Sequence, residues 1–189
     1  MSALRVVDTV TEHAPRKLDI AAGRNVRQGY TGIDLEADSD IVWDLFDFPW
    51  PIKTGSVREV NVSHFVEHIP HYRPGWQKDG WFLFWEEVQR ITRKGAVVHV
   101  VSPHVRNDRA FWDPTHVRFI QPMNYFYLDP GWRDANGLGH YTSADFEVVV
   151  QSYTGESEDI ASRSDEAKAY AHAHYWNSTG DLVVELKRR

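Results

Sequence analysis

The segment Lys17–Leu35 reads KLDIAAGRNVRQGYTGIDL, in which two short apolar runs flank a turn of small residues. The first run ends near Asp19, the turn covers Ala21 to Gly23, and the second run ends at Asp34. A turn of small residues lets a ligand approach the backbone, and an acid at the tip of the following strand can accept hydrogen bonds from ribose hydroxyls. The segment therefore predicts a nucleotide-binding strand–loop–helix unit.

On the C-terminal side of this segment, short apolar runs alternate with stretches in which apolar residues recur every three or four positions. In the helix predicted over Gly80–Arg93, Trp81 and Trp85 share one face, and Lys94-Gly95 is expected to end it. This alternation predicts an α/β fold with a Rossmann-like, mostly parallel twisted sheet, helices on both of its faces and an antiparallel pair of C-terminal strands. The expected strands are Leu18–Ala21, Thr31–Leu35, Ile41–Asp44, Val57–Val62, Ala96–Val101, Phe146–Gln151 and Leu182–Lys187, with a further helix near Asp165–Trp176.

The composition limits the class of protein. The 189 residues suffice for one domain, which we place at residues 15–189 after an N-terminal arm of residues 1–14. The chain has no cysteine, no apolar run long enough to cross a membrane and no secretory signal pattern, so we expect a soluble, cytoplasmic protein. The net charge of −6 argues against bulk binding of nucleic acid. Four arginines form either a local basic rim or, as we favour, a set of solvated side chains: Arg106, Arg109, Arg118 and Arg133.

Six motifs follow one another in a characteristic order: LDIAAGRN, GYTGIDL, IVWDL, VNVSHFVEHI, ITRKGAVVHVVSP and DPTHVRFI. Together they resemble the class I S-adenosylmethionine-dependent methyltransferases, especially the small stand-alone members common in bacteria and phages. The resemblance covers about Lys17 to Ile120 and implies S-adenosyl-L-methionine as the cofactor. The chain departs from the family at two positions. The family usually has glycine at the position of Ala21, and it often has a further glycine at the position of Asn25.

The resemblance also implies a role for individual residues. Asp19, Ala21 and Gly23 would form the loop under the methionine part of the cofactor. Asp34 would hold the ribose hydroxyls, and Leu35 would pack on the adenine. The adenine edge would be lined by Asp44 and Leu45, and the methyl group and substrate would be faced by Ser63 and His64.

The segment PHVRNDRAFWDPTHVRFIQP follows the fifth predicted strand and is expected to form the substrate region. His116 is a candidate general base whose ring Asp113 would orient, so the candidate catalytic residues are His64, His116 and Asp113. In the alternative interpretation, Asp113 only begins a turn before Pro114 and His116 binds a backbone carbonyl.

The run His64-Phe65-Val66-Glu67-His68 matches H-x-x-E-H, the pattern of an inverted zinc protease helix. In that arrangement two histidines bind zinc and the glutamate acts as a general base. The alternative is structural, with Glu67 in a first helical turn and His68 packed beneath the sheet. The interpretation that we favour assigns no metal ligands.

The sequence thus predicts S-adenosylmethionine-dependent methyl transfer to a small molecule, sugar or nucleobase. One alternative is a binding or assembly subunit that has lost catalysis, which Ala21 favours because an extra methyl group could narrow the cofactor pocket. A second is a zinc-dependent hydrolase built on the HFVEH motif. Neither the acceptor nor the oligomeric state follows from the sequence.

Overall fold

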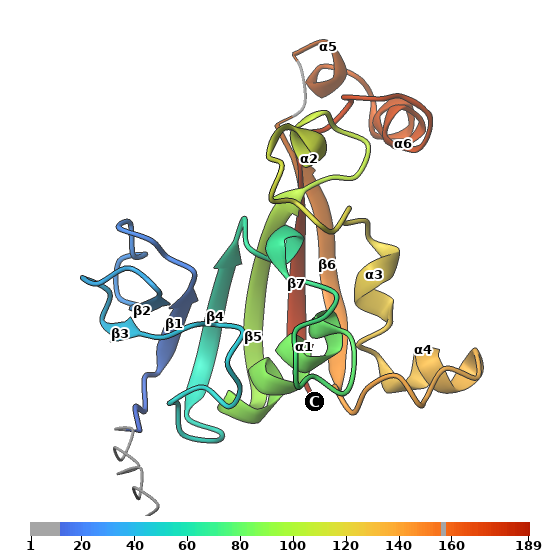
Figure 1. Cartoon of the computed structure of the whole chain (residues 1–189). Helices are drawn as coiled ribbons and strands as arrows, with labels where there is room; N and C mark the ends of the chain where they lie inside the picture. Colours follow the sequence, from blue (N-terminus) through green and yellow to red (C-terminus); the bar gives the residue numbers. More distant parts are fainter. Residues whose placement is uncertain (1–11, 156–157) are drawn as a thin grey trace, which may run out of the picture.

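A seven-stranded sheet forms the centre of the computed structural model, which describes residues 12–155 and 158–189 (Figure 1). The strand order is β3-β2-β1-β4-β5-β7-β6; neighbours among β1 to β5 pair in parallel, and β7 is antiparallel to both β5 and β6. The Rossmann-like mixed sheet with an antiparallel C-terminal pair is therefore confirmed. The strands are β1 (Lys17–Ile20), β2 (Thr31–Asp34), β3 (Ile41–Val42), β4 (Val57–Ser63), β5 (Thr92–Pro103), β6 (Phe146–Thr154) and β7 (Asp181–Arg188).

In the described part of the chain, the helices lie in the connections between β4 and β5, between β5 and β6, and between β6 and β7. The 3-10 turn η1 (Val66–His68) and the helix α1 (Gly80–Ile91) join β4 to β5. Three short helices join β5 to β6, and two more join β6 to β7. They are α2 (Arg109–Trp112), α3 (Met123–Phe126), α4 (Pro130–Ala135), α5 (Glu158–Ala161) and α6 (Asp165–His174).

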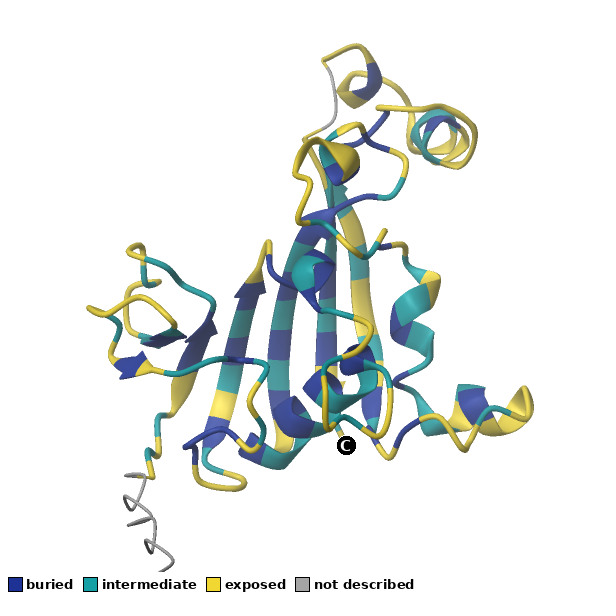
Figure 2. Cartoon of the chain, in the orientation of Figure 1, coloured by how far each residue is buried: buried dark blue, intermediate teal, exposed yellow. Residues whose placement is uncertain are grey.

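The core lies between α1 and one face of the sheet. Trp81 and Trp85 of α1 are buried, as the helical spacing predicts, and Tyr125 of α3 meets both rings edge-on at 5.5 and 6.0 Å between centroids. Along β4, β5 and β7 buried residues alternate with more exposed ones, so only one face of these strands carries the core (Figure 2).

The helix α1 ends earlier than predicted. Thr92 already has extended backbone, and its hydroxyl donates to the carbonyl of Val88 at 2.7 Å. The predicted end at Lys94-Gly95 is wrong, because both residues lie within β5. A β-branched residue whose hydroxyl competes for helix carbonyls favours strand over a further helical turn.

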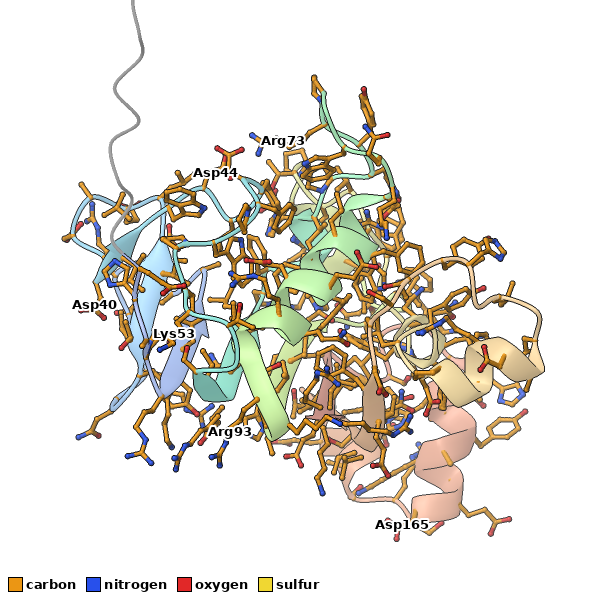
Figure 3. All side chains as sticks on the ribbon, turned by 90° about the horizontal axis from the view of Figure 1, so that it is seen from below. Asp40, Asp44, Lys53, Arg73, Arg93 and Asp165 are labelled. Atoms are coloured by element: carbon orange, nitrogen blue, oxygen red, sulfur yellow. The ribbon has the colours of Figure 1, made fainter. Side chains whose placement is uncertain are left out.

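The first unit is strand–loop–strand, and the helix predicted between β1 and β2 is absent from Ala21 to Tyr30. Gly23 and Gly29 both have positive φ in this short connection, which interrupts any helical turn. The connections from β2 to β3 and from β3 to β4 also contain no helix. In the view from below, α1 lies on one side of the sheet (Figure 3). On the other side, β1 and β4 are covered mainly by their own side chains and, among the described residues, not by a helix.

Polar side chains on that second face bind one another across the strands. Glu59 of β4 accepts from Lys17 at 2.7 Å and from the hydroxyl of Tyr30, while His99 of β5 lies 3.3 Å from Glu185 of β7. Burial and the neighbouring Glu59 carboxylate raise the pKa of Tyr30 to about 12.

Most of the predicted N-terminal arm, residues 1–11, lies outside the described residues. At its end, His13 forms a parallel bridge with Ile52 and exchanges backbone hydrogen bonds with Pro51 and Lys53.

Candidate functional site

A hollow of about 430 Å³ opens at the carboxyl ends of β1 and β4. Asp19, Ala21 and Ser63, three of the residues predicted to contact a cofactor, line it together with Arg27 and Asn61. The strand order reverses at this place, since β1 has β2 on one side and β4 on the other. Ligands of open α/β sheets bind at such a switch point.

Asp19 holds the walls of this hollow together. Its side chain is 4% exposed; one carboxylate oxygen accepts from the backbone N–H of Arg27, and the other accepts from the amide of Asn61, both at 2.7 Å. Asp19 and Asn61 are register partners on β1 and β4. Neither Asn61 nor Arg27 was predicted, because only the strand register places Asn61 opposite Asp19 and only the folded loop brings Arg27 back to it.

Asp34 links the second strand to the loop after the first. Its Oδ2 accepts from the backbone N–H of Gly23 at 2.9 Å, and its Oδ1 accepts from that of Glu36 at 3.1 Å. A carboxylate has about four acceptor positions, so Asp34 retains the capacity to accept from a ligand. The adjacent Leu35 is 67% exposed and offers a free apolar surface.

Ala21 has φ of +55°, in the left-handed region that favours glycine. The loop therefore adopts the backbone conformation expected at the glycine position of the resembled family, although the residue is alanine. Burial of the neighbouring β1 and the hydrogen bond from Ala21 N–H to the carbonyl of Ile33 at 2.9 Å maintain this conformation.

Replacing Ala21 by Gly is expected to stabilise the protein by about 1 kcal/mol, because a left-handed residue with a Cβ carries a cost of that order. Urea unfolding measures the change. Ala22→Gly is the matched control, since Ala22 has no positive φ and glycine there should destabilise by about 0.5–1 kcal/mol. Equal effects of the two substitutions would contradict backbone strain at Ala21.

The two predicted adenine-edge residues lie in different environments. Asp44 accepts from Arg73 at 3.0 Å, and the two side chains lie side by side in Figure 3. Leu45 is 5% exposed and belongs to the core. The structure therefore brings Asp44, but not the Leu45 side chain, to the surface near β3, and Arg73 is a partner that the motif did not indicate.

His64 follows β4 directly and has φ of +52°, which turns the chain sharply at the sheet edge. Its Nδ1 lies 3.5 Å from Oε1 of Glu67, and its Nε2 lies 3.9 Å from Asp181. The proximity of Glu67, together with Asp181, raises the pKa of the His64 imidazole despite partial burial. Ser63 beside it is exposed and lines the hollow, whereas His64 is exposed just beyond the end of β4 and is not part of the lining.

His116 and Asp113 have partners other than each other. The Nδ1 of His116 lies 3.0 Å from the carbonyl of Ala110, as in the structural alternative. Asp113 accepts from the hydroxyl and the N–H of Thr115, at 2.6 and 2.8 Å, and these hydrogen bonds lower its pKa. The predicted orientation of the His116 ring by Asp113 is therefore wrong.

The H-x-x-E-H segment does not form a metalloprotease helix. Only Val66–His68 is helical, as a single 3-10 turn, and His64 lies before it. Two histidines one turn apart on a long helix, which the zinc protease pattern requires, are not formed. Instead, the structure brings Glu67 and His68 together with the distant His116.

The four arginines form no continuous basic rim, and the favoured interpretation, a set of solvated side chains, is wrong for Arg118 and Arg133. Arg118 is half-buried and donates to the carbonyls of Ile69 and Pro70, and Arg133 is 4% exposed and donates to those of Tyr127 and Ala144. Both satisfy backbone carbonyls, and Arg118 also pairs with Asp79 at 2.6 Å. The other two lie at the surface: Arg109 pairs with Asp181 at 3.1 Å, and Arg106 is exposed.

Comparison with solved structures decides the fold type. A SAM-dependent methyltransferase from Archaeoglobus fulgidus matches 95% of this chain and 88% of its own, with a TM-score of 0.62 at 17% identity. The chain has the class I methyltransferase fold. An S-adenosylmethionine-dependent methyltransferase from Mesorhizobium loti also shares this fold, with a TM-score of 0.51 at 12% identity over 95% of this chain and 92% of that one.

No protein-family model and no curated protein matches the sequence. The likeness to methyltransferases is therefore one of fold. In the part of the chain that the structure describes, none of the helices is both long and apolar enough to span a membrane.

Proposed function

We propose that the protein binds S-adenosylmethionine in the hollow at β1 and β4 and transfers its methyl group to an acceptor. The observation that carries this proposal is the position of Asp34, whose carboxylate is bound to the loop N–H of Gly23 beside the switch in strand order. An acid at the end of the second strand, next to a loop that exposes backbone, suits a ribose.

The loop after β1 and the end of β2, which lie beside residues that line the hollow, fit this cofactor. A Cβ built on Gly23 would meet no atom within 4 Å, so the space above the loop is open. Asp34 has acceptor positions to spare, and Leu35 presents an exposed apolar side chain beside it. When bound, the cofactor supplies a methyl group on a sulfonium, whose C–S bond breaks as the acceptor atom bonds to the methyl carbon.

The side chains of this chain would position the reactants and exclude water, which accounts for most of what direct methyl transfer needs. Ser63 and His64, at the end of β4, are the residues that we place beside the acceptor. His116 and Asp113 would support that side from the segment after β5. We propose a small molecule, a sugar or a nucleobase as the acceptor.

Thermal-shift titration with S-adenosylmethionine and S-adenosylhomocysteine tests cofactor binding, with NAD and ATP as controls. Ligand at 100 times its dissociation constant should stabilise the fold by about 2.7 kcal/mol. A response to the two sulfur compounds alone supports the proposal. The absence of any response would favour a binding or assembly subunit without methyl transfer.

Replacing Asp34 by Ala is expected to weaken S-adenosylmethionine binding by about 1.5–3 kcal/mol, the scale of hydrogen bonds to a charged group. Isothermal titration calorimetry measures the change. Asp38→Ala is the matched control, because Asp38 is an exposed acid in the connection that follows Asp34. Unchanged affinity in Asp34→Ala would contradict the placement of the ribose.

A further inference from the structure

Glu67 is a buried carboxylate for which the described residues provide no hydrogen bond. The residue is 1% exposed, and neither of its carboxylate oxygens has a hydrogen-bonding partner. The Nδ1 of His64, 3.5 Å from Oε1, is the ion-pair contact that the structure shows for it. Since an ionised carboxylate without a hydrogen-bond donor is costly to bury, a bound cation would offset this cost.

Two histidines lie next to this carboxylate. One ligand atom from each of Glu67, His68 and His116 falls within 4.8 Å of the others, and the two imidazole rings are 4.7 Å apart between centroids. His68 follows β4 and His116 follows α2, so the tertiary fold assembles a group that is dispersed in the sequence.

The hydrogen bond of His116 leaves one ring nitrogen available as a ligand. Its Nδ1 lies 3.0 Å from the carbonyl oxygen of Ala110. A carbonyl only accepts, so Nδ1 carries the proton in this contact. In the neutral imidazole Nε2 then keeps its lone pair.

A relay of three side chains gives His68 the same tautomer. The Thr115 hydroxyl lies 2.6 Å from the Asp113 carboxylate and 3.0 Å from Nδ1 of His68. Because the hydroxyl donates its single proton to the carboxylate, it accepts from Nδ1–H of His68. The Nε2 of His68 is therefore also left with its lone pair.

We propose that Glu67, His68 and His116 bind a divalent transition metal ion, with zinc as the best match. Two imidazoles and one carboxylate suit zinc, whereas magnesium and calcium prefer oxygen ligands. Metal-binding histidines usually donate their second N–H to a carbonyl or a polar side chain, as both do here. Ligands at about 2.0–2.2 Å from zinc lie about 3.3 Å apart, so the three side chains would close by up to about 1.5 Å on binding.

Three protein ligands leave zinc a position for a further oxygen ligand. Glu67 and His68 lie in η1, which follows β4, and β4 ends at Ser63, a residue that lines the hollow. A metal ion there would bind an oxygen atom of the methyl acceptor and make it easier to deprotonate. This role rests on the proposed function, whereas the metal site itself does not.

Titration of the chelator-treated full chain with zinc tests the site by calorimetry, with one ion per chain expected. His116→Asn removes a ligand while its amide can still donate to Ala110, and it should weaken binding on the order of 100-fold or more. Thr115→Val removes the hydroxyl that accepts from His68 and donates to Asp113 but leaves all three ligands in place, and it should weaken binding about 10–100-fold. His140→Gln alters an exposed histidine outside the group and should leave the affinity unchanged.

Failure of this proposal is distinguishable from failure of the proposed function. His116→Asn should keep its affinity for S-adenosylmethionine, and Asp34→Ala should keep its affinity for zinc. The absence of stoichiometric zinc binding by the wild-type chain would overturn the metal site. Equal zinc affinity in the wild type and His116→Asn would do so as well. Because Thr115 is exposed, Thr115→Val tests the site even where His116→Asn folds poorly.

Discussion

Replacing Trp85 by Ala is expected to lower the free energy of unfolding by about 3–5 kcal/mol, the usual cost of deleting a large aromatic side chain from a core. Trp85 is fully buried and lies at the centre of the aromatic core. Its ring meets Phe84 at 5.2 Å, Phe146 at 5.9 Å and Tyr125 at 6.0 Å between centroids. Alanine would leave a cavity where α1, α3 and β6 meet.

Urea unfolding at equilibrium measures this loss, and Trp112→Ala is the matched control. Trp112 is the same residue type but 73% exposed at the end of α2, so its removal should change stability by no more than about 0.5 kcal/mol. Similar losses for both tryptophans would show that the core is not organised around Trp85.

The second large effect is expected for Asp19→Ala, which should destabilise the protein by about 3 kcal/mol, because two donors lose a charged acceptor. The N–H of Arg27 and the amide of Asn61 both donate to this buried carboxylate. Since these contacts connect the loop after β1 to β4, S-adenosylmethionine binding should be lost together with the stability. Unfolding by urea and calorimetry with the cofactor measure the two effects.

Asp19→Asn is the conservative control. It keeps the size of the side chain, but its amide can accept at only one of the two contacts and turns an N–H toward the other. About half of the stability loss is expected, since one hydrogen bond survives. A full loss in Asp19→Asn, equal to that of Asp19→Ala, would indicate that charge rather than acceptor geometry is decisive.

The regular elements could be predicted because their signals are local. The helix at Gly80 begins where Asp79 accepts from the N–H of Trp81, and its apolar spacing matches the buried face. The short helices α2 to α4 were not predicted, since four to six residues carry no readable periodicity. The missing helix after β1 reflects glycines with positive φ, whose backbone state is decided by the loop as a whole.

Some residues of the candidate site could likewise be predicted from the sequence, and others could not. Asp34 could be proposed from its place at the end of a predicted strand, and Asp19 and Ser63 from the resemblance to a family; Asp19 and Ser63 line one hollow because strand ends meet at one edge of a parallel sheet. Leu45 was placed in the site but packs in the core, because its neighbourhood depends on the chain that folds over it. Asn61 lies beside Asp19 only through the strand register.

The sequence by itself determined the order of the strands, the buried face of α1 and the acidic strand ends, since hydrophobic periodicity and turn residues act over a few neighbours. Only the tertiary structure decided which polar groups meet. Glu67 and His116 are far apart along the chain, and Asp113 reaches His68 through Thr115 rather than orienting His116. Such contacts depend on distances between elements, which packing of the whole core sets and no local pattern records.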